Sequence, residues 1–156
     1  MVIDKYFEDF VVGDTVVSEE FTISNQDVET YAKMVRLDRH PHFDIKFIQK
    51  EFGRTDYLVP GCLTLAFVDG YWANLVSPAV PFSPHYGQDR VRYLSTLFCN
   101  EPIRCEFKLI DKRPKNDRYG LLTFETYVKR QDGGPVLFEI DKLLVPCRDS
   151  RADAGR

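Results

Sequence analysis

The sequence has no cysteine pair at the C-x-x-C spacing of a structural zinc site, and no cluster of cysteines that could serve as a disulfide framework. The four cysteines stand among apolar or strand-forming residues, at Cys62, Cys99, Cys105 and Cys147. Buried thiols in a reducing compartment are therefore expected. The chain also lacks GxGxxG and GxxxxGK[ST] stretches, so neither a nicotinamide site nor an ATP site is predicted.

Concentrated positive charge and long apolar runs are absent too. The net charge is −3 and no basic stripe is dense enough to follow a phosphate backbone, so nucleic acid is not an expected partner. The longest apolar run, residues 61–76, contains Asp69 and is too short to cross a bilayer. The first ten residues carry acids and lack the apolar core of a signal peptide. We therefore expect a cytoplasmic protein with no membrane partner.

What the chain does contain suits one globular domain of the α+β class. Its 156 residues are 44% hydrophobic and 29% charged, which is ordinary for such a domain. A strand is predicted over residues 15–22. Ser24 then caps a helix that runs to about residue 36, with an acid three residues on completing a capping box. A polar turn leads into a short helix over residues 44–52, for which Asp44 is the N-cap.

A very apolar helix and a series of strands follow. Residues 61–76 are apolar nearly all round and should be enclosed by other structure. A proline-rich loop is predicted over residues 77–89, with His85 exposed in it. Apolar and polar residues then alternate, which predicts strands over residues 90–98, 103–111, 119–130 and 135–145. The expected fold is a curved antiparallel sheet wrapped around the long apolar central helix, with a partly apolar outer face that favours a dimer.

Three stretches carry a resemblance to a known family. They are YFEDFVVGDTV at residues 6–16, DRHPHFD at 38–44 and FGRTDYLVPGCLTLAFVDGYWA at 52–73. With the order of elements over residues 6–147, they resemble the MaoC-like hydratases of the hotdog fold, which include (R)-specific enoyl-CoA hydratases. The resemblance implies a single hotdog domain over residues 1–147. The polar composition of residues 148–156 predicts a disordered tail. The resemblance also implies a hydro-lyase acting on an enoyl-CoA or 3-hydroxyacyl-CoA thioester. Such an enzyme would be a homodimer or higher homo-oligomer, with no cofactor beyond the coenzyme A of its substrate.

The chemistry of water addition gives roles to residues of these motifs. A base must take a proton from water, an acid must protonate the α-carbon, and donors must hold the enolate-like oxygen. The resemblance implies Asp38 and His42 as the catalytic pair, and an imidazole can work both ways near neutral pH. Free amides at a helix N-terminus attract anions, so Gly61 and Cys62 are expected to hold the thioester oxygen. His40, at a turn-stabilising position of the motif, is counted with them among the substrate-binding residues.

Two departures from the family pattern affect this site. Asp38 precedes His42 by four positions, whereas the family has five. Either the turn is remodelled so that Asp38 still reaches the site, or Leu37 stands in the place of the acid. In addition, Pro60 replaces the histidine that comes before the helix.

Two other functions stay open. One is a hotdog acyl-CoA thioesterase, with Asp56 or Asp69 as its carboxylate. The other is a non-catalytic acyl-CoA-binding subunit of a heteromer, which would bind without turning over. A metal site is not expected, because the family motif accounts for the alternating acids and histidines of residues 38–44 and no further ligand cluster is evident in the sequence.

Overall fold

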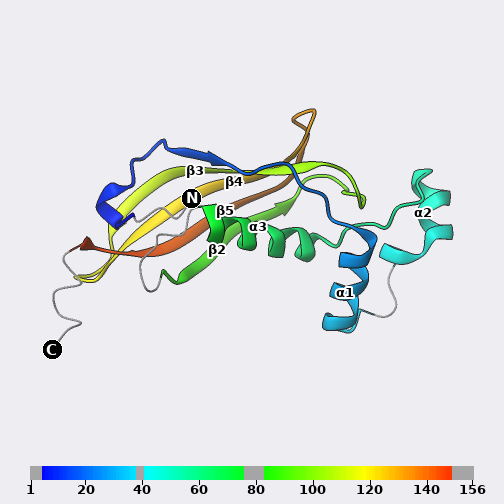
Figure 1. The fold of residues 1–156 in the computed structure, drawn as a ribbon, viewed down its shortest axis with the longest axis horizontal. Helices are drawn as coiled ribbons and strands as arrows, with labels where there is room; N and C mark the ends of the chain where they lie inside the picture. The colour runs from blue at the N-terminus through cyan, green and yellow to red at the C-terminus, as the bar shows by residue number, and fades with distance from the viewer. Residues whose placement is uncertain (1–4, 38–40, 76–82, 149–156) are drawn as a thin grey trace.

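The computed structural model describes residues 5–37, 41–75 and 83–148 of the chain. Its elements, in chain order, are the 3-10 helix η1 (Phe7–Asp9), β1 (Thr15–Val17), α1 (Asn25–Val35), the 3-10 helix η2 (Pro41–Phe43), α2 (Ile45–Phe52), α3 (Gly61–Leu75), β2 (His85–Tyr93), β3 (Ile103–Pro114), β4 (Tyr119–Arg130) and β5 (Pro135–Pro146). Figure 1 shows α3 along one face of the sheet, with α1 and α2 beyond the end at which α3 begins. Apart from Arg148, the predicted tail lies outside the described residues.

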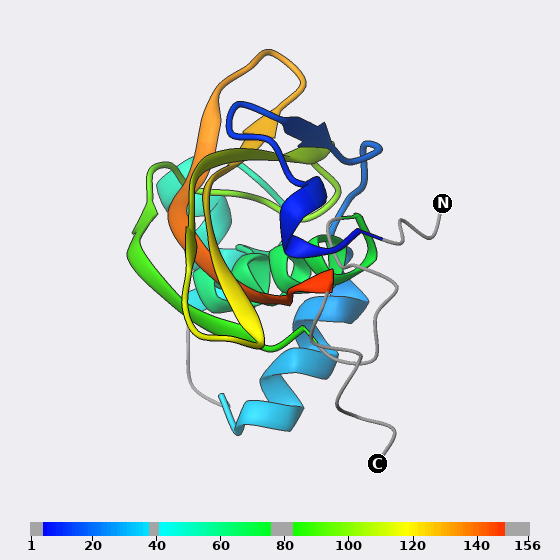
Figure 2. The same ribbon diagram turned by 90° about the vertical axis from the view of Figure 1, so that its left-hand side faces the viewer.

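Five antiparallel strands form one sheet in the order β1-β3-β4-β5-β2. The alternation that predicted β3 puts four fully buried side chains on its inner face, namely Ile103, Cys105, Phe107 and Leu109. Strands β4 and β5 pair along nearly their whole length, from Tyr119 opposite Pro146 to Lys129 opposite Pro135. The sheet curves around α3 (Figure 2), as twisted strands do when they bury one face on a helix. The predicted α+β class with a curved antiparallel sheet is confirmed.

Helix α3 buries one stripe against the sheet and leaves another side open. Thr64, Val68 and Trp72, four residues apart, are buried, and the indole of Trp72 meets the ring of Phe124 edge-on at 5.7 Å between centroids. On the other side is a groove of about 350 Å³, lined by Leu63, Ala66, Phe67, Gly70, Tyr71 and Asn74. Phe21, between β1 and α1, stacks on the rings of Phe67 and Tyr71 at 5.8 and 4.3 Å between centroids. The described part of the chain otherwise covers the helix from the sheet side and leaves this groove open. None of the helices in those ranges is long and apolar enough to cross a membrane.

Helices α1 and α2 begin and end where the local sequence predicts. At α1 the Ser24 N–H donates to Asp27 Oδ2 at 2.8 Å, and the Asp27 N–H donates to Ser24 Oγ at 3.2 Å. At α2 the Asp44 carboxylate accepts an amide of the first turn at 3.1 Å, and Gly53 ends the helix with a φ of 66°. These caps satisfy amides and carbonyls that have no partner within the helix. They also delimit the segment between the helices, which carries His42.

Two strands differ from their predicted ranges. The first was expected over residues 15–22, but β1 is only Thr15–Val17, because the Ser18 hydroxyl takes the Cys105 N–H at 2.9 Å in place of a regular ladder bond. The second, β2, begins at His85, inside the stretch predicted as a loop. Its register is broken twice, and Gly87 and Arg90 have φ values of 149° and 55°. A bulged edge strand has no regular alternation that would reveal it in the sequence.

Candidate functional site

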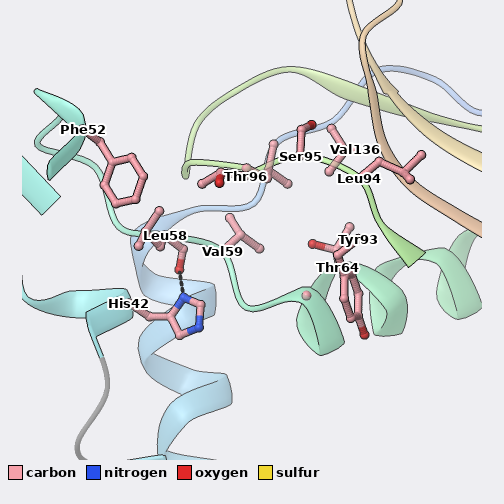
Figure 3. Close-up of a pocket in the computed structure, with 12 residues that line it drawn as sticks. His42, Phe52, Leu58, Val59, Thr64, Tyr93, Leu94, Ser95, Thr96 and Val136 are labelled. Carbon is pink, nitrogen blue, oxygen red and sulfur yellow. Dashed lines mark hydrogen bonds between the residues drawn. The ribbon is translucent and has the colours of Figure 1, made fainter. Parts of the chain in front are cut away.

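His42 is held in one orientation by the segment that leads into α3. Its ring Nδ1 lies 2.9 Å from the carbonyl oxygen of Leu58, and its own carbonyl accepts the Leu58 N–H at 2.9 Å. A carbonyl oxygen can only accept, so Nδ1 carries the proton and the lone pair of the neutral imidazole is on Nε2. Figure 3 shows Nε2 turned away from Leu58. The predicted base thus has a defined tautomer, with Nε2 as its basic nitrogen.

His42 lines a cavity of about 460 Å³ beside the first turn of α3 (Figure 3). The wall combines apolar side chains with a few hydroxyls, and its members include Leu58, Val59, Thr64, Tyr93, Leu97 and Val136. Gly61, the first residue of α3, lines the same cavity. Two of the residues that the sequence marked as functional, His42 and Gly61, are therefore brought together.

Helix α3 begins with the backbone amides of Gly61 and Cys62. Of these two residues, Gly61 is among the described residues that line the cavity and Cys62 is not. The Pro60 carbonyl accepts the first hydrogen bonds of the helix, from Leu63 at 2.9 Å and Thr64 at 3.1 Å. The amides of Gly61 and Cys62 come before these donors, where a helix has no carbonyl one turn earlier to accept them. The positive end of the helix dipole lies at the same place. This turn can therefore stabilise an oxygen that becomes negatively charged.

Tyr93 is a cavity residue that the sequence reasoning did not single out. It ends β2 and lays its ring against Gly61, so that a Cβ on Gly61 would lie 2.6 Å from Tyr93 Cε1. Its hydroxyl is 3.5 Å from Sγ of Cys62, whose side chain is exposed. Partial burial, and then the Cys62 thiol, raise the pKa of Tyr93 to about 12. The phenol therefore stays protonated near neutral pH and can donate a hydrogen bond.

Replacing Gly61 with alanine is expected to lower the free energy of unfolding by about 1 kcal/mol, because the new methyl group pushes the Tyr93 ring outward. The cost stays small since Tyr93 is 52% exposed and can turn. Gly70→Ala is the matched control: it lies on the same helix and has nothing within 4 Å of the added carbon in the described part of the chain. In protein dilute enough to be monomeric, it should gain up to about 1 kcal/mol in helix propensity. Urea unfolding measures both, and equal midpoints for the two variants would contradict the Tyr93 contact.

The remaining predicted residues lie either outside the described ranges or away from the His42 cavity. Asp38 and His40 lie outside the described residues. Asp56 accepts a hydrogen bond from Asn100 Nδ2 at 3.0 Å, and Asp69 stands in the second half of α3. Neither of these two carboxylates is among the described residues that line the His42 cavity. The acids considered for a thioesterase are thus not brought to that cavity.

A second polar cluster lies beside the later half of α3. His85 opens β2, and its Nε2 is 2.5 Å from Oδ1 of Asp141 on β5, a residue that is 1% exposed. Asp69 of α3 stands beside this pair. Glu139 is fully buried, and that burial, followed by the charges of Asp141 and Asp69, raises its pKa to about 8. The prediction that His85 is a loop residue is wrong, because it begins a strand and bonds to a buried carboxylate.

Several solved structures have the same fold as this chain. No family model and no curated protein matches the sequence. Among solved structures, the monoamine oxidase regulatory protein of Archaeoglobus is 24% identical, with 94% of this chain and 99% of that chain covered and a TM-score of 0.79. The R-hydratase PhaJ1 of Pseudomonas aeruginosa is 21% identical, with coverage of 94% and 89% and a TM-score of 0.76. A MaoC-like dehydratase of Rhodospirillum rubrum is 18% identical, with coverage of 92% and 98% and a TM-score of 0.73.

Further matches come from Mycobacterium tuberculosis, two of which bear on the fold. One is a two-protein complex described as a 3R-hydroxyacyl-ACP dehydratase, and the other is a protein described as having a double hotdog fold, 44% of which is covered. The curved antiparallel sheet with α3 on its inner face is thus an arrangement that this chain has in common with solved MaoC-like dehydratases and (R)-hydratases. The chain has the hotdog fold that the sequence resemblance implied.

Proposed function

We propose that this chain is a hydro-lyase that adds water to an enoyl-CoA thioester or removes it from the matching 3-hydroxyacyl-CoA. The proposal rests on the cavity common to His42 and the first turn of α3, with the lone pair of the imidazole directed by the Leu58 contact to Nε2. A base and an anion-stabilising helix end are the groups that this reaction needs close together. The hydratases and dehydratases named among the structural matches support it.

In the direction of hydration, His42 Nε2 takes a proton from water and the oxygen of that water bonds to the β-carbon. The electron pair of the C=C bond moves toward the thioester oxygen, and the amides of Gly61 and Cys62 hold the resulting negative charge. The electron pair then returns as the α-carbon takes up a proton, which leaves the 3-hydroxyacyl thioester. We assign the delivery of that proton to the pair formed by His42 and Asp38. His40 is assigned to the turn that holds this pair.

The walls of the cavity favour an acyl thioester over a wholly polar substrate. Leu58, Val59, Leu97 and Val136 supply apolar surface for an acyl chain. The Thr64 and Tyr93 hydroxyls add a few polar points. A volume of about 460 Å³ is in the range of small-molecule sites. No cofactor is needed for this reaction beyond the coenzyme A that the substrate carries.

The test is the loss of enoyl-thioester absorbance when the purified chain is mixed with crotonyl-CoA or with branched enoyl-CoAs. Conversion to the 3-hydroxyacyl-CoA is the expected result. A parallel assay follows the release of free thiol from acyl-CoAs, which a thioesterase produces and a hydratase does not. Thiol release without loss of the enoyl absorbance would replace the hydratase proposal with the thioesterase.

The open side of α3 favours a second candidate, an acyl-CoA-binding subunit that needs a partner chain. The groove there is apolar and uncovered by the described part of the chain. A second copy would give the homodimer that we propose, whereas a different hotdog chain would give a heteromer like the two-protein complex named above. Sedimentation of the purified chain separates the two. A monomer that binds acyl-CoA and turns it over only after another chain is added would favour the subunit.

A further inference from the structure

We propose that Asp69, His85 and Asp141 form a site for a divalent transition-metal ion that joins α3 to β2 and β5. Each residue comes from a different element, and one ligand atom of each lies within 4.8 Å of the others. Zn²⁺ and Mn²⁺ both bind carboxylate and imidazole ligands. Asp69 stands two turns after Gly61, about 12 Å along the helix. The site is therefore separate from the cavity of His42 and does not depend on the proposed function.

Buried polar atoms at this place lack partners within the described ranges of the chain. Asp141 is 1% exposed and its Oδ2 accepts no hydrogen bond there. Two further buried groups also lack a hydrogen-bond partner there: Nε1 of Trp72, a residue only 6% exposed, and the Ser83 hydroxyl. These three residues line a cavity of about 160 Å³ together with Asp69 and His85. A buried polar atom without a partner is costly. A cation can bind the free oxygen of Asp141, whereas the indole N–H of Trp72 is a donor and needs an acceptor such as the oxygen of a water in the same cavity.

Neighbouring donors already orient both carboxylates. Gln88 Nε2 donates to Asp69 Oδ1 at 3.1 Å, and the Lys142 N–H donates to Asp141 Oδ1 at 2.9 Å. Each of these contacts uses Oδ1, so Oδ2 of the same carboxylate can bind an ion. Hydrogen bonds of this kind hold the ligands of metal sites in place. The 2.5 Å contact between His85 Nε2 and Asp141 Oδ1 must widen by about 1 Å to admit an ion whose bonds are about 2.1 Å long.

The experiment titrates chelator-treated protein with Zn²⁺, and separately with Mn²⁺, in a calorimeter. One ion per chain is expected, with a Tm that rises with metal concentration because the ion binds the folded chain. Asp69→Asn and His85→Gln should each weaken binding by roughly 100-fold. The first replaces an anionic carboxylate with a neutral amide, and the second replaces the imidazole nitrogen with an amide, which transition-metal ions bind more weakly. Asp89→Asn is the matched control. This acid lies on the same strand as His85 but pairs with Lys142, so its loss should leave affinity unchanged.

Mn²⁺ is included because it binds thiols poorly, which separates this site from zinc held by cysteines. Asp69 and His85 are both exposed, so their variants should keep the fold, and far-UV circular dichroism checks this. Failure of both ions to bind saturably overturns the proposal and leaves water as the occupant of the cavity. Binding that survives in both variants also overturns it, because the ion is then held elsewhere. None of these measurements uses hydratase turnover.

Discussion

His42→Ala and His42→Asn are both expected to lower kcat for enoyl-CoA hydration by about 10³-fold, with a much smaller change in KM. Alanine removes the whole imidazole. Asparagine keeps an N–H close to the position of Nδ1, so it can still donate to the Leu58 carbonyl, but it has no counterpart of Nε2. If the only role of His42 were its hydrogen bond to the Leu58 carbonyl, asparagine could take over that role and activity would be kept. Equal losses in the two variants therefore identify a base.

Initial rates with crotonyl-CoA measure these losses, and urea unfolding shows whether each variant remains folded. If His42→Asn retains most of the wild-type kcat, His42 is structural and the base is another residue. Asp38→Asn belongs in the same series because of its shortened spacing to His42. A comparable loss would make Asp38 the second member of the pair. Unchanged activity would mean that Leu37 occupies the position of the family's acid and that proton delivery follows another route.

The helices could be predicted closely because their signals are local. Ser24 and Asp27 bond to each other across three residues, and Asp44 and Gly53 act on the turns next to them. The long strands β3 and β5 followed from period-two alternation, since alternate residues along most of each strand are buried. Strand β4 alternates in its second half, whereas the consecutive residues from Gly120 to Phe124 are all buried. Where a strand is bulged, as β2 is, the same reasoning fails.

The candidate site was only partly predictable, because its contacts join distant segments. The hydrogen bond between His85 and Asp141 joins residues 56 positions apart. The sequence next to either residue does not predict this contact. The approach of Tyr93 to Gly61 depends likewise on where β2 ends. The sequence of β5 does contain one signal for the second polar cluster. On β5, the alternation that buries Leu137 and Leu143 also turns Glu139 and Asp141 inward. Two acids on an apolar face of a strand indicate a site or a paired cluster.

Gly120→Ala is expected to have the largest effect on stability, a loss of about 3 kcal/mol in the free energy of unfolding. Gly120 lies near the start of β4, and a Cβ there would be 2.0 Å from Cδ2 of Phe7. Phe7 is 8% exposed. Lys112 holds its segment, because the Lys112 Nζ donates to the carbonyls of Phe7 at 3.1 Å and Phe10 at 2.7 Å. The ring therefore cannot turn away as the Tyr93 ring can.

The double variant Phe7→Ala, Gly120→Ala tests the cause of this loss. If the overlap of ring and methyl group is responsible, Gly120→Ala should cost less than about 1 kcal/mol in the Phe7→Ala background, which lacks the ring atoms that the new methyl group would meet. Additive losses in urea unfolding would place the cost in the backbone of β4. The segment η1, dark blue in Figure 1, lies at the end of the sheet away from α1 and α2. Below the lowered Tm, turnover by Gly120→Ala should therefore equal that of the wild type. That result would make YFEDFVVGDTV, one of the stretches that carries the family resemblance, a packing motif separate from the chemistry at His42.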